Sequence, residues 1–239
     1  MSVAASHDPV PQTLSRAVGI DLEGYRPQHV DERIRRALER ERVPTVARLT
    51  RLLVADPDAR ARFRRSIAVS VSGLFRDPEQ FDLIERDVLP ELLPLRRLSV
   101  CSVGCSNGSE LYSIALLLEA AGALDRSFLL GCDLLEENLE AARRGVYSDV
   151  AVPMSVRNHA RWEQRDVLGQ GVPPGKWRLV LCRNLAIYLA PPAKQRLHEA
   201  LAAALGSGGF LVLGRSERLA NPRTLGLEPF SAHIYRSTS

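Results

Sequence analysis

Residues 98–118 read LSVCSVGCSNGSELYSIALLL, and this stretch decides the fold. The apolar run Leu98–Val103 has the length of a buried strand and ends in a loop of small residues, Gly104–Gly108. A helical pattern begins almost at once, over Glu110–Ala121. Two glycines allow a sharp turn and the close approach of a ligand to the backbone. The loop is therefore either a tight turn between strand and helix or part of a ligand site.

The alternation of strand and helix patterns in this stretch continues to the end of the chain. Apolar runs alternate with helical patterns, which is typical of a parallel sheet with helices on both faces. The expected strands are Leu98–Val103, Phe128–Cys132, Trp162–Arg165, Leu179–Cys182, Phe210–Leu213 and Ala232–Tyr235, and the expected helices are Glu110–Ala121, Glu136–Arg144 and Pro192–Leu205. The predicted fold is α/β, with a doubly wound, mostly parallel sheet. Ligands bind outside the carboxyl ends of the strands in such sheets, so the loops after the strands should share one edge.

The segment before residue 92 has a different pattern. From Leu14 onward apolar residues recur at helical spacing, and two prolines near residue 92 mark a boundary. We expect disorder over residues 1–13, a small all-helical N-terminal domain over residues 14–91, and a ligand-binding domain over residues 92–239.

Positive charge is concentrated in the helical segment. Between Arg26 and Arg65 there are 12 Arg and 6 Asp or Glu, a balance of +6, whereas the whole chain is +4, so the remainder carries −2. Arg33, Arg36 and Arg40 form a stripe along one side of a helix. The stripe is either a surface that attracts acidic partners in a salt-sensitive way, or a solvated face in an arginine-rich chain.

Composition excludes several classes of protein. Of the 239 residues 45% are apolar and 25% charged, which is ordinary for a globular protein. No apolar run reaches the roughly 18 residues that cross a bilayer, and the first residues lack the features of a secretory signal. Four cysteines, none in a CxxC pair, lie in or beside apolar runs, which predicts buried free thiols and no metal site. We therefore expect a cytoplasmic protein that neither inserts into membranes nor binds nucleic acid.

An acidic residue narrows the choice that the glycine loop leaves open. Asp133 ends the second expected strand, 25 residues after Gly108, where a carboxylate commonly accepts hydrogen bonds from ribose hydroxyls. The loop contains only G-x-x-x-G, and Leu111 stands where a dinucleotide fingerprint has its third glycine. This combination favours a nucleoside that lacks a diphosphate, so S-adenosylmethionine fits better than NAD.

Five ordered strings carry a resemblance to a known family. They are SVSGLFRDPEQF, VGCSNGSELYSIA, CDLLEENLEAARRGVYS, LCRNLAIYL and GGFLVLGRSERL. Together they resemble the chemotaxis receptor methyltransferases, the CheR family. The resemblance implies a class I methyltransferase, with a Rossmann-like domain after a small helical domain. It also implies that S-adenosyl-L-methionine donates a methyl group to receptor glutamate side chains and leaves S-adenosyl-L-homocysteine.

The resemblance assigns roles to individual residues. Ser72 and Arg76 would face the cofactor and the methyl group, Asp133 would bind the ribose, Asp166 would contact the adenine, and Tyr188 would lie near the transferred methyl. The expected catalytic residues are Arg76 and Tyr188. The expected cofactor contacts, by the same resemblance, are Ser72, Arg76, Gly104, Glu110, Asp133, Asp166, Val167, Arg183 and Asn184.

The sequence departs from the family at several positions. Ser109 replaces the first of two glutamates that end the glycine loop, Leu111 stands where many relatives have proline, and Arg215 stands where histidine is usual. Many relatives also have a three-stranded subdomain after the segment RRGVYS, and some use it to dock on a receptor tail. Only Asp149–Arg161 fills that gap here, which is too short for three strands of about five residues each. We therefore expect no docking through such a subdomain.

Methyl transfer to a carboxylate requires little acid–base chemistry. Glutamate has a reference pKa of about 4.3, so its carboxylate is a competent nucleophile at neutral pH, and the protein must mainly align the reactants and exclude water. The Arg76 guanidinium can hold a carboxylate in bidentate geometry, or it can cap a helix or pair with Asp77. Tyr188 can hydrogen-bond substrate or cofactor, or it can be a half-buried ring with a wet hydroxyl. Asn184 can contact the cofactor or cap a turn.

Three functions stay open from the sequence. The first is methylation of glutamates in a chemoreceptor or a receptor-like signalling protein, an acidic helical bundle that would dock on the stripe of Arg33, Arg36 and Arg40. The second is methylation of another carboxylate acceptor, which the missing subdomain favours. The third is a non-catalytic regulator that binds S-adenosylmethionine, which the altered glycine loop allows.

Overall fold

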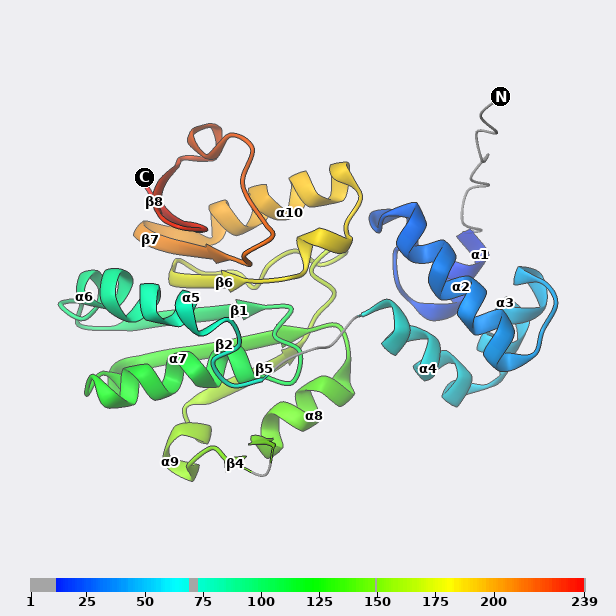
Figure 1. Cartoon of the computed structure of the whole chain (residues 1–239), viewed down its shortest axis with the longest axis horizontal. Helices are drawn as coiled ribbons and strands as arrows, with labels where there is room; N and C mark the ends of the chain where they lie inside the picture. The colour runs from blue at the N-terminus through cyan, green and yellow to red at the C-terminus, as the bar shows by residue number, and fades with distance from the viewer. Residues whose placement is uncertain (1–11, 69–72, 149, 239) are drawn as a thin grey trace. The chain divides into compact units, whose positions relative to one another are not determined.

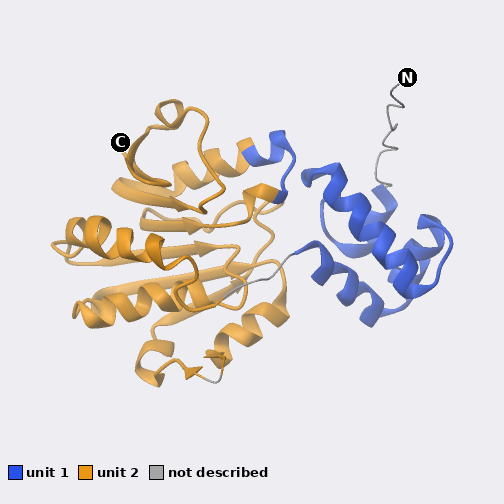
Figure 2. Cartoon of the chain, viewed as in Figure 1, with its two compact units in different colours: residues 1–69, 188–194 blue, residues 70–187, 195–239 orange. Residues whose placement is uncertain are grey.

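The computed structural model describes residues 12–68, 73–148 and 150–238. By its internal contacts the chain divides into two compact units (Figure 2). Unit 1 consists of residues 1–69 and 188–194, and unit 2 consists of residues 70–187 and 195–239. No helix among the described residues is both long and apolar enough to cross a membrane.

Unit 1 is built from short helices. They are α1 (Gln12–Val18), the 3-10 turn η1 (Leu22–Gly24), α2 (Pro27–Glu41), α3 (Val46–Ala55) and α4 (Pro57–Ile67). The side chains of Thr45 and Asp56 accept hydrogen bonds from backbone N–H groups in the first turns of α3 and α4, which would otherwise lack partners. Buried Leu14, Val30 and Leu53 belong to the core of this unit. Because α1 begins at Gln12, the last two residues of the segment that we expected to be disordered are helical.

Unit 2 is built on a seven-stranded sheet (Figure 1). Its strands are β1 (Leu98–Val103), β2 (Ser127–Asp133), β5 (Ala160–Gln164), β6 (Trp177–Cys182), β7 (Leu205–Leu213), β8 (Leu227–Ser231) and β9 (Ile234–Ser237). The order is β5-β2-β1-β6-β7-β9-β8. The first five strands are parallel, and β9 runs antiparallel to both of its neighbours, β7 and β8. Strands β2 and β5 are added on one side of β1, and β6 and β7 on the other, so the strand order switches between β1 and β6. The carboxyl ends of the strands at such a switch point flank the usual ligand crevice.

The helices of unit 2 precede the first strand or connect the strands. They are α5 (Pro78–Leu83), the π-helical η2 (Ile84–Val88), α6 (Leu89–Leu92), α7 (Ser109–Ala120), η3 (Leu124–Arg126), α8 (Glu136–Arg144), α9 (Met154–Arg157), η4 (Ala186–Tyr188), α10 (Pro191–Ala204) and η5 (Pro222–Leu225). Since crossovers between parallel strands are right-handed, α7 and α8 cover one face of the sheet and α10 covers the other. The predicted doubly wound, mostly parallel fold is confirmed.

Residues 188–194 belong to unit 1, although in the sequence they lie between β6 and most of α10. The Arg26 N–H donates to the Tyr188 carbonyl (2.9 Å), and the Ala190 N–H donates to the Gly24 carbonyl (2.9 Å). Backbone hydrogen bonds therefore attach this segment to the end of η1 and to the residue before α2.

The region of the missing subdomain contains a minimal hairpin. Strands β3 (Val146–Tyr147) and β4 (Val150–Ala151) have two residues each and pair antiparallel. The one-turn helix α9 follows, and β5 begins at Ala160. Over the described part of the gap, residues 150–161, there is thus no three-stranded module.

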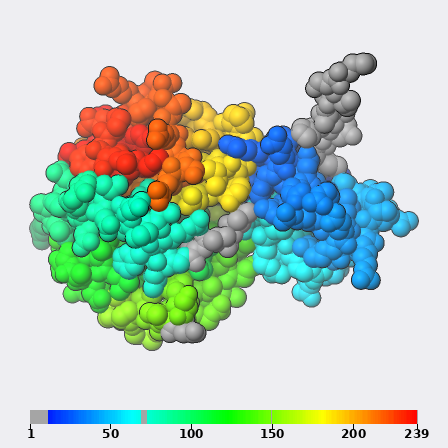
Figure 3. All heavy atoms as spheres, in the orientation of Figure 1, coloured from blue at the N-terminus to red at the C-terminus, as the bar shows by residue number. Residues whose placement is uncertain are grey.

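The division between the units comes earlier in the chain than the sequence suggests. We expected a boundary near residue 92, whereas residues 78–92 belong to unit 2. Phe81, Ile84 and Leu92 share one buried cluster with the sheet residue Val100. In the space-filling view of Figure 3 this segment, in cyan to green, covers part of the visible face of unit 2. The apolar residues of this segment pack in the core of unit 2, which explains why the segment belongs to that unit.

Candidate active site

The glycine loop after β1 is shaped first by protein packing. Gly108 has φ of +80°, and a Cβ there would lie 2.5 Å from the Trp162 ring and 2.6 Å from the Ala142 Cβ. Gly104 has φ of +68°, and a Cβ there would lie 3.2 Å from Leu185. Both positions therefore require glycine for conformation, and Gly108 also lets β5 and α8 approach the loop. The tight turn and the ligand loop are compatible readings of the same residues.

Asp133 ends β2 and joins the loops around it. Its Oδ2 accepts a hydrogen bond from the Ser106 N–H (2.8 Å), and its Oδ1 accepts from the Leu135 N–H (3.0 Å) and the Asn138 amide (2.9 Å). Burial raises the pKa of Asp133 above its usual value, although these hydrogen bonds oppose the rise. A carboxylate offers about four lone-pair positions, so about one remains for a ligand hydroxyl.

Arg183, directly after β6, is the centre of a buried polar cluster. Its guanidinium donates to the side chains of Asp77 (2.8 Å), Glu110 (3.3 Å) and Gln80 (2.7 Å), and to the Arg76 carbonyl (2.8 Å). The Arg183 side chain is 4% exposed. Four of about five N–H donors are thus used within the protein, and the expected contact between Arg183 and the cofactor stays a prediction.

Glu110, near the start of α7, is the acidic member of this cluster nearest the glycine loop. Its Oε1 accepts a hydrogen bond from the Ser102 hydroxyl (2.7 Å) on β1, and its Oε2 faces Arg183. Burial raises the pKa of Glu110, and the positive charge of Arg183 opposes the rise. The site therefore contains a carboxylate that is poorly solvated and only partly compensated.

Arg76 lies in a strained loop that is anchored on both sides. Phe75 and Asp77 have φ of 51° and 59°, a left-handed conformation that costs of order 1–3 kcal/mol for a residue other than glycine. The Phe75 N–H donates to the Ser113 hydroxyl (2.8 Å), and the Arg76 carbonyl accepts from Arg183. The anchored loop holds the Arg76 backbone at the carboxyl edge of β6 and leaves its side chain exposed.

The loop that carries Asn184 is organised by Glu217. This buried carboxylate accepts hydrogen bonds from the N–H groups of Asn184 (2.7 Å), Gly214 (2.8 Å) and Ile187 (3.3 Å). Asn184 itself has φ of 60°. One carboxylate therefore joins the loops after β6 and β7 and stabilises a left-handed residue of the candidate site.

The loop after β5 carries Asp166 and Val167, which are both half-buried. The Asp166 carboxylate accepts a hydrogen bond from the Leu168 N–H (3.0 Å) and so closes its own turn. The Arg165 N–H donates to the Asp133 carbonyl (2.8 Å). This bond ties the loop to the end of β2.

The structure brings most of the expected site residues to one edge of the sheet. They are Arg76, Gly104, Glu110, Asp133, Asp166, Val167, Arg183 and Asn184. Ser72 lies outside the described residues. Tyr188 belongs to unit 1, where its ring centroid lies 5.0 Å from that of His29, so its catalytic role stays a prediction.

A comparison with models of protein families identifies the family of this chain. The family model of the CheR methyltransferase SAM-binding domain matches residues 70–158 and 149–232. The chain belongs to the CheR methyltransferase family. Both matched segments together contain all the expected site residues, and they extend from the segment before α5 to the end of β8.

Individual relatives agree over nearly the whole chain. A chemotaxis protein methyltransferase from Listeria innocua is 27% identical over 95% of this chain and 95% of its own length. Chemotaxis protein methyltransferase 1 from Pseudomonas aeruginosa is 25% identical over 87% of this chain and 88% of its own length. A solved TehB-like SAM-dependent methyltransferase from Corynebacterium glutamicum aligns at 16% identity with a TM-score of 0.44, over 75% of this chain and 94% of that one. The family model, which describes an SAM-binding methyltransferase domain, shows that this chain is an S-adenosylmethionine-dependent methyltransferase.

The residues at the carboxyl edge fit S-adenosylmethionine chemically. The cofactor carries a sulfonium and an ammonium group, and Glu110 and Asp133 provide two poorly solvated carboxylates near the glycine loop. Within the described part of the chain, the Ser106 hydroxyl of that loop is buried without a hydrogen-bond partner. A cationic nucleoside would complement both features.

Sequence reasoning missed two polar residues of this site. Glu217 lies within the string GGFLVLGRSERL, and an acid that closely follows an apolar strand was the available signal. Gln80 is also buried, and its amide bridges Arg183 and the Leu213 carbonyl. A glutamine beside buried Phe81 was a weaker signal, because its two partners lie more than 100 residues away in the sequence.

Proposed function

We propose that this CheR-family methyltransferase methylates glutamate carboxylates in an acidic, chemoreceptor-like protein. The observation that carries the proposal is Arg76, an exposed guanidinium on a strained loop fixed by Arg183 and Ser113. A guanidinium binds both oxygens of a carboxylate in a fixed plane. An exposed guanidinium on an anchored stretch of backbone at the cofactor edge is suited to orient a carboxylate acceptor.

The proposed chemistry needs orientation more than proton transfer. S-adenosylmethionine supplies a methyl carbon activated by its sulfonium, which an acceptor carboxylate can take up as the carbon–sulfur bond breaks. Since glutamate is ionised at neutral pH, no residue has to remove a proton first. Arg76 would orient the acceptor, Glu110 and Asp133 would hold the cofactor, and the loop held by Glu217 would position Asn184.

An acidic partner is supported by the charge of unit 1, although the stripe itself is partly neutralised. Arg36 pairs with Glu32 (2.6 Å), and Arg40 pairs with Glu41 (2.8 Å). The excess of six positive charges over residues 26–65 therefore includes arginines beyond the stripe. We propose that an acidic helical surface binds this unit, with the stripe as part of the contact.

The proposed reaction can be tested with methyl-labelled S-adenosylmethionine and the cytoplasmic fragment of a chemoreceptor. Label should enter the receptor fragment, and mild alkali should release it as volatile methanol, because methyl esters are alkali-labile. Replacing the receptor's acceptor glutamates with glutamine should abolish incorporation. Label that resists alkali, or that enters only small carboxylic acids, would refute protein-glutamate methylation. Cofactor binding without any transfer would favour a non-catalytic regulator.

Asp133→Ala is expected to weaken binding of S-adenosylmethionine and S-adenosylhomocysteine by about 1–3 kcal/mol, because ribose hydroxyls lose a charged acceptor. Since burial raises the pKa of Asp133, acidification should weaken binding to the wild type at a higher pH than for an ordinary aspartate. Titration calorimetry over a pH series measures both effects. Asp125→Ala, which removes an exposed acid from η3, is the matched control. Equal affinity of wild type and Asp133→Ala would remove Asp133 from the site.

Changing Arg33, Arg36 and Arg40 together to glutamate should raise the Michaelis constant for the protein acceptor steeply at low salt. Cofactor affinity should stay near wild type, and high salt should shrink the difference through screening. The matched control is the same triple change at Arg48, Arg51 and Arg60 in α3 and α4, which alters net charge equally. Equal effects of both variants would show general attraction without a stripe-specific contact. No effect of the stripe variant at any ionic strength would make the stripe a solvated face.

A further inference from the structure

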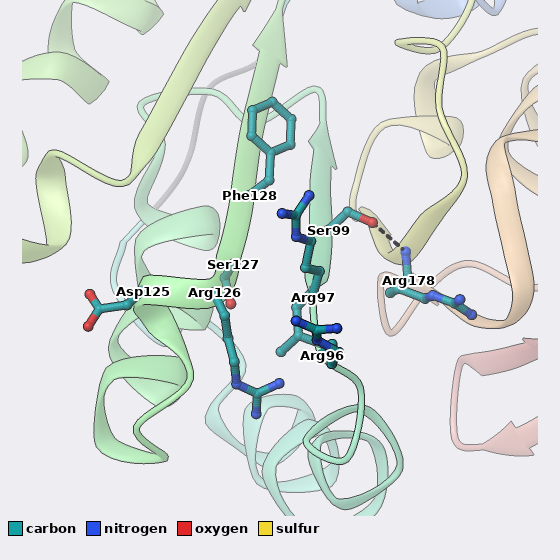
Figure 4. Close-up of a pocket in the computed structure, with 9 residues that line it drawn as sticks. Arg96, Arg97, Ser99, Asp125, Arg126, Ser127, Phe128 and Arg178 are labelled. Atoms are coloured by element: carbon teal, nitrogen blue, oxygen red, sulfur yellow. Dashed lines mark hydrogen bonds between the residues drawn. The ribbon is translucent and has the colours of Figure 1, made fainter.

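A basic pocket lies at the edge of the sheet opposite the candidate active site (Figure 4). It is lined by residues at the amino ends of β1, β2 and β6: Arg96, Arg97, Leu98, Ser99, Asp125, Arg126, Ser127, Phe128 and Arg178. Strands of six residues rise about 20 Å, so this pocket is separated from the cofactor loops by the length of the sheet. Its volume of about 600 Å³ falls in the usual range for small-ligand sites.

The charges in this pocket are unbalanced. Four arginines line it, with a single acid, Asp125. The Asp125 side chain is fully exposed and lies 3.3 Å from His159, and Figure 4 shows it directed away from the arginines. Like charges gathered in one hollow repel each other, and an anionic ligand removes that cost.

The arginines differ in how far the protein already uses them. Arg126 donates to the carbonyls of Leu93 (2.7 Å) and Leu95, so it fixes the wall of the pocket. Arg178 donates from its guanidinium to the Ser207 carbonyl. Arg96 and Arg97 are exposed and form no ion pair among the residues that the structure describes. Two guanidinium groups are thus available to bind an anion, and the oxygens of a phosphate or a carboxylate match their geometry.

An aromatic ring adds a second kind of contact. Phe128 is 51% exposed, which is unusual for a phenyl ring on a central strand. Its ring stacks on buried Trp177, with centroids 5.8 Å apart and an angle of 19° between planes. Figure 4 shows Arg97 extending toward the Phe128 ring. An exposed ring with a rigid backing is a platform on which a nucleobase can stack.

We propose that this pocket binds a nucleotide, with its phosphates on Arg96 and Arg97 and its base on Phe128. The base accounts for the exposed ring, which an acidic peptide or a free phosphate would leave unused. Binding here is independent of the methyl acceptor and of the proposed function, because the pocket contains none of the cofactor-edge residues.

The test is titration calorimetry of the full chain with ATP in the presence of saturating S-adenosylhomocysteine, so that ATP cannot occupy the cofactor site. Binding should weaken at least about tenfold in the double variant Arg96→Ala and Arg97→Ala, and only slightly in the charge-matched control Arg196→Ala and Arg223→Ala. Phe128→Leu should weaken ATP about tenfold and leave inorganic pyrophosphate unchanged, since only the nucleotide loses its stacking partner.

Several results would overturn the proposal. They are ATP binding that is equal in wild type and the Arg96 and Arg97 variant, pyrophosphate binding as tight as that of ATP, or binding of poly-glutamate without binding of ATP. Each variant should bind S-adenosylhomocysteine with wild-type affinity. This control separates a failure of the proposed nucleotide site from unfolding of unit 2.

Discussion

Replacing Arg183 with methionine is expected to lower the free energy of unfolding by about 3–5 kcal/mol, because removing one partner of a buried ion pair leaves an uncompensated charge. The guanidinium is the cation shared by Asp77 and Glu110, and little of it reaches solvent. Methionine keeps much of the side-chain length. The loss in the free energy of unfolding should therefore come from the lost charge more than from a cavity. Urea denaturation of wild type and variant measures the difference.

An exposed pair in the same unit is the control for this variant. Arg215 lies 3.1 Å from Glu79, with both side chains more than half exposed. Arg215→Met should change the free energy of unfolding by no more than about 1 kcal/mol. If both variants unfold at the same urea concentration as wild type, the Arg183 cluster does not stabilise the fold.

The pH dependence of the Arg183 variant has a defined sign. In the folded protein burial raises the pKa of Glu110 above its unfolded value, and Arg183 opposes that rise. Without Arg183 the folded pKa rises further, so the folded state binds a proton more tightly than the unfolded state. The stability deficit of the variant should therefore shrink as the pH falls through this raised pKa. A deficit that grows on acidification would contradict the assignment of Glu110 as the stranded carboxylate.

The core of unit 2 was predictable because its strands are apolar runs between clear turn signals. The observed bounds of β1 and α8 are those expected from the sequence. Strand β8 was not predicted from the sequence. Its sequence LEPFS has an internal proline and mostly exposed residues, and the strand lies at the edge of the sheet. A local pattern of apolar residues identifies a strand only where the strand is buried, and few residues of this edge strand are buried.

Features that depend on tertiary partners could not be located from the sequence. An apolar stripe over residues 78–92 shows that a helix is buried, but not whether it packs on the sheet or on other helices. Gly108 pointed to a ligand loop, whereas the nearest atoms to its missing Cβ belong to Trp162, 54 residues later in the sequence. In both cases the packing partner lies outside the short stretch of sequence that carries the pattern, so that stretch could not identify it.

Some of the charge pairing in α2 was readable from spacing. Glu32 lies four residues before Arg36, a separation that places both side chains on one helix face. Counting the arginines alone therefore overstated the free charge of the stripe. The buried cluster around Arg183 was less accessible from the sequence. The partners of Arg183 lie 73 residues before it at Glu110, 103 at Gln80 and 106 at Asp77.

Arg76→Ala is expected to lower kcat for the protein acceptor on the order of 10²-fold, since loss of acceptor orientation has effects of this size. The anchor to Arg183 should persist in this variant, because it uses the Arg76 carbonyl and not its side chain. Single-turnover methylation with saturating acceptor measures the effect. Calorimetry with S-adenosylhomocysteine separates the two roles predicted for Arg76, since a residue that also contacts the cofactor will lower this affinity.

Arg76→Lys tests whether charge alone is sufficient. Lysine keeps the positive charge but cannot bind two carboxylate oxygens in one plane, so its turnover should stay well below wild type. Arg215→Ala, which removes another exposed guanidinium of unit 2, should retain most activity. If Arg76→Lys is fully active, the bidentate geometry is unnecessary and Arg76 acts through its charge. If Arg76→Ala is also fully active, Arg76 has no part in orienting the acceptor, and the strained loop serves only to position Asp77 against Arg183.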